Sequence, residues 1–422
     1  MTFLDFGDII TSEYNFIKGM ARTMKITFES HYLSSREDGR HVSTMASFLE
    51  MLRNREMKLT LPDELSKHSF DAWRGDLKNK VRELLQLDFF EREAEGQPAP
   101  RLLSCVKRDT YRVERWEFYP DRYSAVPFLA LIPGIANEDN KVPAVMCFPG
   151  STYSKEFIAG EPLLDKATCQ MVKYPERNKM ALYMVKNGMA AFAFDNPEIA
   201  ECALEIERPN DYGATSRKQL CHGLLQSGLS YFGVSTSQKL VALDFIKNLP
   251  YVDNERIAVS AHSLGCDDAM HVAVLRDEIR AIVFNDLVAD AKHRYYATTD
   301  YDEDKMRNDV GAWHIVPGQY MNYDRSDLLA ALAPRWLALN EGGAQYYIDK
   351  VLRGYRVFDA EERVQITHYP KYSSPDVRSK DYFPPLAGLT GEDYFKYTNT
   401  DAPDHSFREE PSLRLLKKAF GC

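Results

Sequence analysis

The residues with the clearest potential for chemistry surround Ser263. The apolar run 256–261 (RIAVSA) is followed by 262–265 (HSLG) and then by the pattern of a buried helix. A serine at the sharp turn between a buried strand and a helix is a nucleophile elbow, and such a tight turn requires small residues two positions before and after the serine. Ala261 and Gly265 meet this requirement. We predict that Ser263 is a nucleophile; the alternative is a serine that only caps the following helix.

A serine nucleophile needs a histidine within hydrogen-bond reach to accept its proton. Ten histidines are present, and His405 lies in a loop between the last strand-like run and the closing helix pattern 412–420. A catalytic base is expected there in a sheet of this kind. His262 adjoins the serine and is expected to point elsewhere, and His368 lies inside the last strand-like run. We therefore predict that His405 is the base.

The acid that would orient this imidazole has two candidates. Three residues after the first glycine of 341–345 (EGGAQ), where an aspartate is expected, the chain has Gln345, which carries no charge. Glu341 follows the apolar run 335–340, and Asp286 follows the preceding run, so each stands at the end of a strand. The sequence leaves Glu341 and Asp286 as equal candidates, whereas Asp404 is expected to point away from His405.

Acyl transfer also needs N–H donors for the developing oxyanion. The backbone N–H of Leu264 is one candidate, because it comes with the elbow. The other is expected from the loop after 143–148, where Gly150 allows close approach and Ser151 or Thr152 would supply the N–H. An ordinary turn after a strand would explain Gly150 equally well.

The elements that must position these residues read as an α/β fold. Short and almost wholly apolar runs alternate with helical patterns from about residue 105, which is typical of a mostly parallel sheet covered on both faces. Functional residues are then expected at the carboxyl ends of the strands. A pair of strands is predicted at 112–120 and 126–134, and further strands at 143–148, 189–195, 256–262, 281–285, 335–340 and 364–370.

The first 95 residues have helical patterning and little strand character. In 42–58 the residues Met45, Phe48, Leu49 and Leu52 share one helical face, and 70–90 has a similar pattern. The segment 91–100 (EREAEGQPAP) reads as a linker. We predict a helical extension over 1–95 and a catalytic domain over 105–422, in which 196–234 has room for a lid or a substrate-shaping insertion.

Composition excludes several classes of function. The 422 residues include 53 basic and 62 acidic ones, a net charge of −9, so nucleic acid and anionic membrane are poor partners. No run approaches the ~20 apolar residues of a membrane span. Seven scattered cysteines without CxxC spacing argue against disulfides and structural zinc. The acidic N-terminus lacks a signal peptide's basic start, so the chain as written is expected to be cytoplasmic.

Several segments together resemble a known family. They are CFPGSTYSKE, DNPEIAE, LDFIKNLPYVDNERIAVSAHSLG, DLLAALAPRWLALNEGG, HYPKY and TDAPDHSF. Over roughly residues 110–420 they are similar, in the expected order, to the acetyl xylan esterase-like, dienelactone hydrolase-related branch of the α/β-hydrolase superfamily. The resemblance implies a serine esterase without metal or organic cofactor, with Ser263 and His405 in matching positions. It also implies an acid at position 345; some related carbohydrate esterases instead take it from the preceding strand, which would favour Asp286.

We therefore expect an esterase that cleaves a small acyl ester through an acyl-enzyme, with an acetylated or uronic-acid sugar as substrate. Loop aromatics would form a sugar-stacking rim (Trp313, Tyr320, Tyr323, Tyr346, Tyr347, Tyr394). Arg208, Arg217 and His222 are read as a solvated loop rather than as a carboxylate site. The alternatives are a catalytically impaired fold that binds a ligand, favoured by Gln345, and a lactonase or peptidase with the same triad. The oligomeric state is left open.

Overall fold

The computed structural model describes residue 34 and residues 36–422 apart from 165–173, 207, 212, 299–310 and 381–388. The part of the predicted helical extension that falls on residues 1–33 lies outside the described residues. So do two positions of the predicted insertion at 196–234.

A nine-stranded sheet forms the centre of the molecule, with the strand order β1-β2-β3-β5-β4-β6-β7-β8-β9. Strands β4 to β9 run parallel to one another, and β1, β2 and β3 form an antiparallel edge that joins at β5. The strands are β1 (Arg101–Lys107), β2 (Tyr111–Phe118), β3 (Val126–Pro133), β4 (Val142–Phe148), β5 (Ala190–Phe194), β6 (Val252–His262), β7 (Ile279–Asn285), β8 (Trp336–Leu339) and β9 (Val364–Ile366). The predicted mostly parallel sheet is confirmed.

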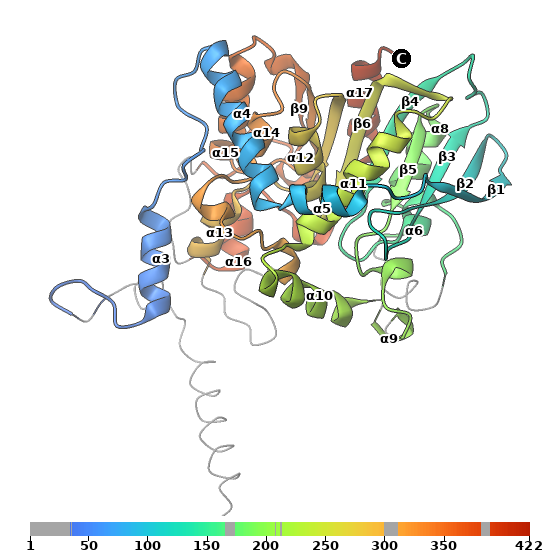
Figure 1. Ribbon diagram of the computed structural model, residues 1–422. Helices are drawn as coiled ribbons and strands as arrows, with labels where there is room; N and C mark the ends of the chain where they lie inside the picture. The colour runs from blue at the N-terminus through green and yellow to red at the C-terminus, as the bar shows by residue number, and fades with distance from the viewer. Residues whose placement is uncertain are drawn as a thin grey trace, which may run out of the picture.

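Helices cover both faces of this sheet (Figure 1). They are α3 (Thr44–Asn54), α4 (Lys67–Leu84), α5 (Leu87–Ala94), α6 (Lys155–Ala159), α8 (Met180–Lys186), α9 (Arg208–Asp211), α10 (Ala214–Gln226), α11 (Tyr231–Ile246), α12 (Gly265–Leu275), α13 (Ala291–Ala297), α14 (Arg325–Ala330), α15 (Gln345–Arg356), α16 (Gly391–Tyr397) and α17 (Glu409–Phe420). Short 3₁₀ turns lie at η1 (Ala200–Cys202), η3 (Ala312–His314), η4 (Gln319–Met321), η5 (Glu361–Arg363), η6 (Pro370–Tyr372), η7 (Pro375–Val377) and η8 (Ala402–Asp404).

The two faces of the sheet form two separate hydrophobic cores. Along β4, Met146 and Phe148 belong to the core with α4, α11, α12 and α14, whereas Val145 and Cys147 belong to the core with α6, α8 and α17. This alternation follows from the two-residue period of a strand. Since both faces are buried, β4 is apolar at every position, and this is why the sequence shows runs rather than alternation.

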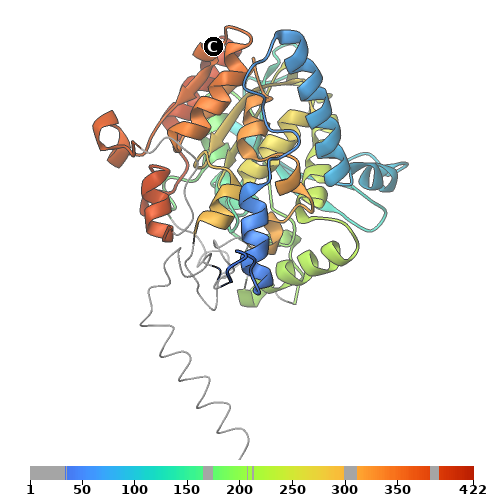
Figure 2. The same cartoon turned by 90° about the vertical axis from the view of Figure 1, so that its left-hand side faces the viewer.

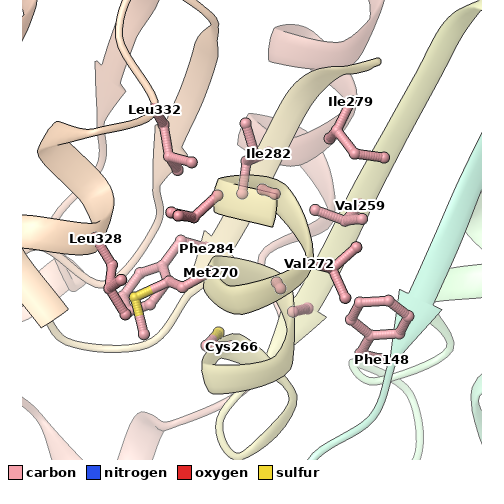
Figure 3. Close-up of a cluster of buried hydrophobic side chains, with 14 of the residues drawn as sticks. Phe148, Val259, Cys266, Met270, Val272, Ile279, Ile282, Phe284, Leu328 and Leu332 are labelled. Atoms are coloured by element: carbon pink, nitrogen blue, oxygen red, sulfur yellow. The ribbon is translucent and has the colours of Figure 1, made fainter. Parts of the chain in front are cut away.

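Helix α12 is the best-buried helix of the first core. Figure 3 shows Cys266, Met270 and Val272 from this helix beside Phe148, Val259 and Phe284 from the strands. All of its residues from Gly265 to Leu275 are buried. The turn that enters α12 at Ser263 is therefore held by dense packing on the sheet.

The region before the sheet packs onto the helices and strands of the central core rather than standing apart. Figure 2 shows α3 and α4 lying along the side of the molecule. Phe70, Leu77 and Val81 of α4 are fully buried in the same core as α12. The connection between α3 and α4 is also bonded to the body, because the Leu61 N–H donates to the Asp327 carboxylate at 2.7 Å.

Three details of the elements differ from the sequence prediction. Helix α3 buries Ala46, Leu49 and Leu52, whereas Met45 and Phe48 are 42% and 41% exposed, so its inward face is rotated from the predicted one. The edge strand β1 was not predicted, because all of its residues are exposed and no burial pattern marks it. Arg208, Arg217 and His222 lie on the helices α9 and α10 and Arg217 is buried, so the reading of these residues as a solvated loop is wrong. Among the described residues, we find no helix long and apolar enough to cross a bilayer.

Phe70 tests how strongly the N-terminal helices contribute to stability. Its ring lies 5.3 Å from that of Trp73 and 5.1 Å from that of Phe358. We expect Phe70→Ala to lower the free energy of unfolding by about 3–5 kcal/mol, since it removes a large buried side chain and leaves a cavity. Urea unfolding measures the change. The control is Asn79→Ala on the exposed face of α4, and equal stability of the two variants would contradict the packing role.

Candidate active site

The turn at Ser263 has the backbone strain of a nucleophile elbow. Ser263 has a φ of 52°, a left-handed conformation that is uncommon for residues other than glycine. Its N–H donates to the Asn285 carbonyl at 3.1 Å, which ties the turn to the end of β7. Gly265 is needed because a Cβ there would lie 2.4 Å from the Phe148 carbonyl oxygen. The close approach brings the start of α12 against the end of β4.

His405 and Glu341 are joined by a short hydrogen bond. His405 Nδ1 lies 2.6 Å from Glu341 Oε2, and the other carboxylate oxygen accepts the Ser406 N–H at 3.2 Å. The Glu341 side chain is fully buried, whereas 30% of the His405 side chain is exposed. One imidazole nitrogen is thus held by a buried carboxylate at the end of β8, and the ring stays accessible from outside.

The electrostatics of the pair favour a charged imidazole. Burial of the ring opposes protonation, but the charge and hydrogen bond of Glu341 outweigh it and raise the pKa of His405 to about 9. Burial raises the pKa of Glu341 above its usual value, and His405 works against that rise. Tyr369 lies beside the same carboxylate, and burial together with the charge of Glu341 raises the pKa of its hydroxyl.

Asp286 is close to this pair but is bonded elsewhere. Its carboxylate accepts the Leu287 N–H at 2.8 Å and lies 3.5 Å from the Arg325 guanidinium. Its charge still adds to the rise in the pKa of His405. Gln345 begins α15 on the surface, where its amide donates to Asp349 at 2.7 Å. Of the two predicted acids, the structure therefore brings only Glu341 into contact with His405.

The loop after β4 is held by its carbonyl groups. The Asn196 amide donates to the Gly150 carbonyl at 2.9 Å, and the Arg217 guanidinium donates to the Ser151 carbonyl at 2.8 Å. Among the described residues, the backbone N–H groups of Ser151, Thr152 and Leu264 have no hydrogen-bond partner. These are the three N–H groups that the sequence proposed for an oxyanion.

A buried charge cluster supports the next turn of the same loop. Lys155 is fully buried, its N–H and its ammonium group both bond to Asp195 at 2.7 and 2.8 Å, and its ammonium also lies 2.9 Å from Glu156. Although burial lowers the pKa of Lys155, these carboxylates reverse the effect and raise it. The end of β5 is thereby fastened to α6, which follows the loop. Sequence reasoning did not find Lys155, Asp195 or Asn196 because their partners are distant along the chain.

The prediction that His262 points away from the site is wrong. Its ring stacks on His405 with a centroid distance of 4.6 Å and is 5.9 Å from that of Tyr153 on the other side. Burial lowers the pKa of His262 well below its usual value, and His405 adds to this. Strand β6 ends at His262, directly before Ser263, and the side chain lies between the rings of Tyr153 and His405. A neutral, buried imidazole thus supports the His405 ring.

The donor atoms of His262, Glu341 and His405 lie within 4.8 Å of one another, and among the described residues no other group could hold a metal ion in this way. Glu341 and His405 are already hydrogen-bonded to each other, so these two donor atoms have a partner without a metal ion. That the reaction needs neither metal nor organic cofactor stays a prediction.

Comparison with known proteins assigns the chain to a family. A model of the Abhydrolase family matches residues 27–418. The chain belongs to this family. A crystal structure of a "putative acetyl xylan esterase" from Bacteroides fragilis superposes with a TM-score of 0.84 at 32% identity, covering 93% of this chain and 99% of that one. Methylesterase BT1017 shares the fold, with a TM-score of 0.54 at 17% identity over 87% of this chain and 71% of that one. No curated protein matches the sequence.

These matches confirm the resemblance to the acetyl xylan esterase-like α/β hydrolases and the assignment as an esterase. The predicted rim of aromatics is only partly available in this α/β hydrolase. Tyr323, Tyr347 and Tyr394 are fully buried in the core, so the prediction that they stack on a sugar is wrong. Trp313, Tyr320 and Tyr346 are partly exposed.

The interaction between His405 and Glu341 can be tested by titration. We expect Glu341→Gln to lower the pKa of His405 from about 9 to 6.5 or below, because the amide cannot stabilise the imidazolium while burial still opposes protonation. The pH dependence of the ¹³Cε1 shift in ¹³C-histidine-labelled protein, assigned with His405→Gln, measures it. Asp286→Asn is the matched control and should lower this pKa less. A larger effect of Asp286→Asn would overturn the assignment of the partner.

Proposed function

We propose that the protein is a serine esterase that removes small acyl groups from sugars. Ser263 is the nucleophile, His405 the general base and Glu341 the acid that orients it. The observation that carries the proposal is the 2.6 Å hydrogen bond between His405 and Glu341, with the His405 ring 4.6 Å from that of His262, the residue that precedes a serine with a strained backbone. The name of the Bacteroides fragilis relative, an acetyl xylan esterase, supports an acetylated sugar as the substrate class.

The first half of the reaction acylates Ser263. Its hydroxyl oxygen attacks the ester carbonyl carbon, and the hydroxyl proton passes to the free Nε2 of His405. The oxyanion of the tetrahedral intermediate accepts hydrogen bonds from Leu264 N–H and from Ser151 or Thr152 N–H, which carry no other partner. When the carbon–oxygen bond to the alcohol breaks, His405 returns the proton to the leaving oxygen.

In the second half, water attacks the acyl-enzyme and His405 accepts its proton. Collapse of the second intermediate releases the carboxylic acid, and the proton returns to Ser263. Glu341 stays ionised throughout and stabilises the imidazolium that forms twice in each cycle. The Ser263 hydroxyl makes no hydrogen bond in the described structure, and catalytic contacts of this kind often tighten only when substrate binds.

Gln345 does not by itself argue for an impaired site. In this arrangement the charge that the imidazole needs comes from Glu341, four residues earlier, and Gln345 lies on the surface of α15.

Substitution of the three proposed groups tests the mechanism with p-nitrophenyl acetate. We expect Ser263→Ala to lower kcat by roughly 10⁴–10⁶-fold and Glu341→Gln by roughly 10³–10⁴-fold, since the first removes the nucleophile and the second the charge behind the base. Asp286→Asn, the matched acid control, should change kcat less than about tenfold, because Asp286 is bonded to Arg325 and Leu287.

The outcome is decided by which variants lose activity. If Asp286→Asn were the more damaging of the two, Asp286 would be the acid. If the wild type neither hydrolysed the ester nor reacted at Ser263 with a fluorophosphonate, the esterase proposal would be wrong.

A further inference from the structure

Arg217 is a buried cation beside the proposed oxyanion loop. It lies on α10, is only 4% exposed, and donates through one terminal nitrogen to the Ser151 carbonyl at 2.8 Å. The centre of its guanidinium lies 4.0 Å above the ring of Trp313 in η3. A carbonyl and an aromatic face therefore fix the guanidinium on two sides.

The charge of Arg217 has no carboxylate partner among the described residues. Two other buried cations do have one, since Lys239 lies 3.3 Å from Asp268 and Lys350 lies 2.7 Å from Asp327, whereas Lys292 is bonded to the Arg55 carbonyl. The Nε–H of Arg217 is buried without any hydrogen-bond partner. Burying a charge without a counter-charge lowers the stability of the fold. The fold nevertheless keeps this guanidinium buried with no carboxylate beside it.

The guanidinium still has donors to offer. Its contact with Ser151 uses one terminal nitrogen, a second side-chain hydrogen bond joins it to Tyr231, and the buried Nε–H has no hydrogen-bond partner. The guanidinium carries five N–H donors in one plane, which is more than these contacts use. A planar fork of this kind matches the two oxygens of a carboxylate.

We propose that Arg217 binds a carboxylate of the substrate, so that the ester is carried by an acidic saccharide such as a uronic acid or its neighbour. This inference rests on the proposed function. The Ser151 carbonyl that Arg217 holds belongs to the same peptide as the Thr152 N–H, a proposed oxyanion donor, and the two groups point in opposite directions. The carboxylate and the reacting carbonyl are then about 8 Å apart on either side of one peptide, roughly the size of one sugar unit.

The charge of the whole chain makes a local cation necessary. At a net charge of −9, the protein does not attract anionic saccharides by its overall field. Selection of an acidic sugar would therefore depend on a fixed group at the site. Arg217 provides such a group next to the loop where the ester must bind.

The experiment compares two substrates that differ only in charge. They are methyl 2,3,4-tri-O-acetyl-glucopyranosiduronic acid and its neutral uronamide, with acetate release as the readout. We expect the wild type to favour the acid by about 10–100-fold in kcat/KM, mainly through KM, as for a charge-assisted hydrogen bond that is lost. Arg217→Gln should bring the ratio close to one, and Arg217→Lys should retain part of it.

Lys218→Gln is the matched control, because Lys218 is the exposed neighbour of Arg217 on the same helix and carries the same charge. It should leave the preference unchanged. A wild type without preference would overturn the proposal. So would an Arg217→Gln variant that loses equal activity on both substrates, since Arg217 would then only position the Ser151 peptide.

Binding to an inactive protein separates this proposal from the esterase proposal. Calorimetry with Ser263→Ala compares methyl glucopyranosiduronic acid with its amide, and neither ligand has an ester to hydrolyse. Tighter binding of the acid that disappears in the Ser263→Ala, Arg217→Gln double variant supports the carboxylate site even if no ester is turned over. Equal binding of acid and amide would overturn it. Arg217→Lys replaces Arg217→Gln if the latter does not fold.

Discussion

A carboxylate that is fully removed from water must find a cation or several N–H donors, and the site depends on how Glu341 meets this demand. Its two oxygens are taken by His405 Nδ1 and by the Ser406 N–H, which are consecutive residues of the loop before α17. The bond therefore fixes the ring of His405 and the backbone of its loop together. Without it, Glu341 would be an unpaired buried charge and the loop would lose its anchor on the sheet.

The same contact sets a conflict between stability and chemistry. Because Glu341 raises the pKa of His405 to about 9, the pair stabilises the folded state fully below the unfolded value of about 6.5, and this contribution is lost as the pH rises through 9. A general base, however, works in its neutral form. His262 is a neighbour of the opposite kind, because it is buried and neutral and stacks on the ring without adding a charge. The His405 ring thus has one charged neighbour and one uncharged neighbour.

Further buried ion pairs hold the other loops at the carboxyl ends of the strands. Lys155 and Asp195 join the loops after β4 and β5. Arg325 bridges Asp286 after β7 and Asp267 in the first turn of α12. Each pair replaces water by a fixed partner, and each joins segments that are far apart in the sequence. Arg217 differs from these pairs because its described contacts are a carbonyl, a tyrosine hydroxyl and a ring, none of which carries a negative charge that would neutralise it.

The sequence predicted the strands from β2 to β9 because burial on both faces leaves apolar runs that need no distant partner to be recognised. It failed at β1, whose residues are all exposed, and at the inward face of α3, where contacts with α13 rather than periodicity decide which residues are buried. The positions of Ser263, His405 and the loop after β4 were predictable because each follows a recognisable element, and their catalytic roles stay predictions. The role of His262 and the contact of Arg217 depend on tertiary packing that no local pattern encodes.

The choice between Glu341 and Asp286 shows where such a prediction ends. Both residues stand at the end of a neighbouring parallel strand, so the strand-end rule treats them alike. What separates them is the third partner, because Arg325 reaches Asp286 from α14, which lies about 40 residues further along the chain. Once Asp286 is satisfied by Arg325 and by its own turn, only Glu341 retains an unpaired oxygen for His405. Which of the two carboxylates contacts His405 therefore depends on an arginine that does not itself contact the histidine, and a chain that moved this arginine would shift the balance between them.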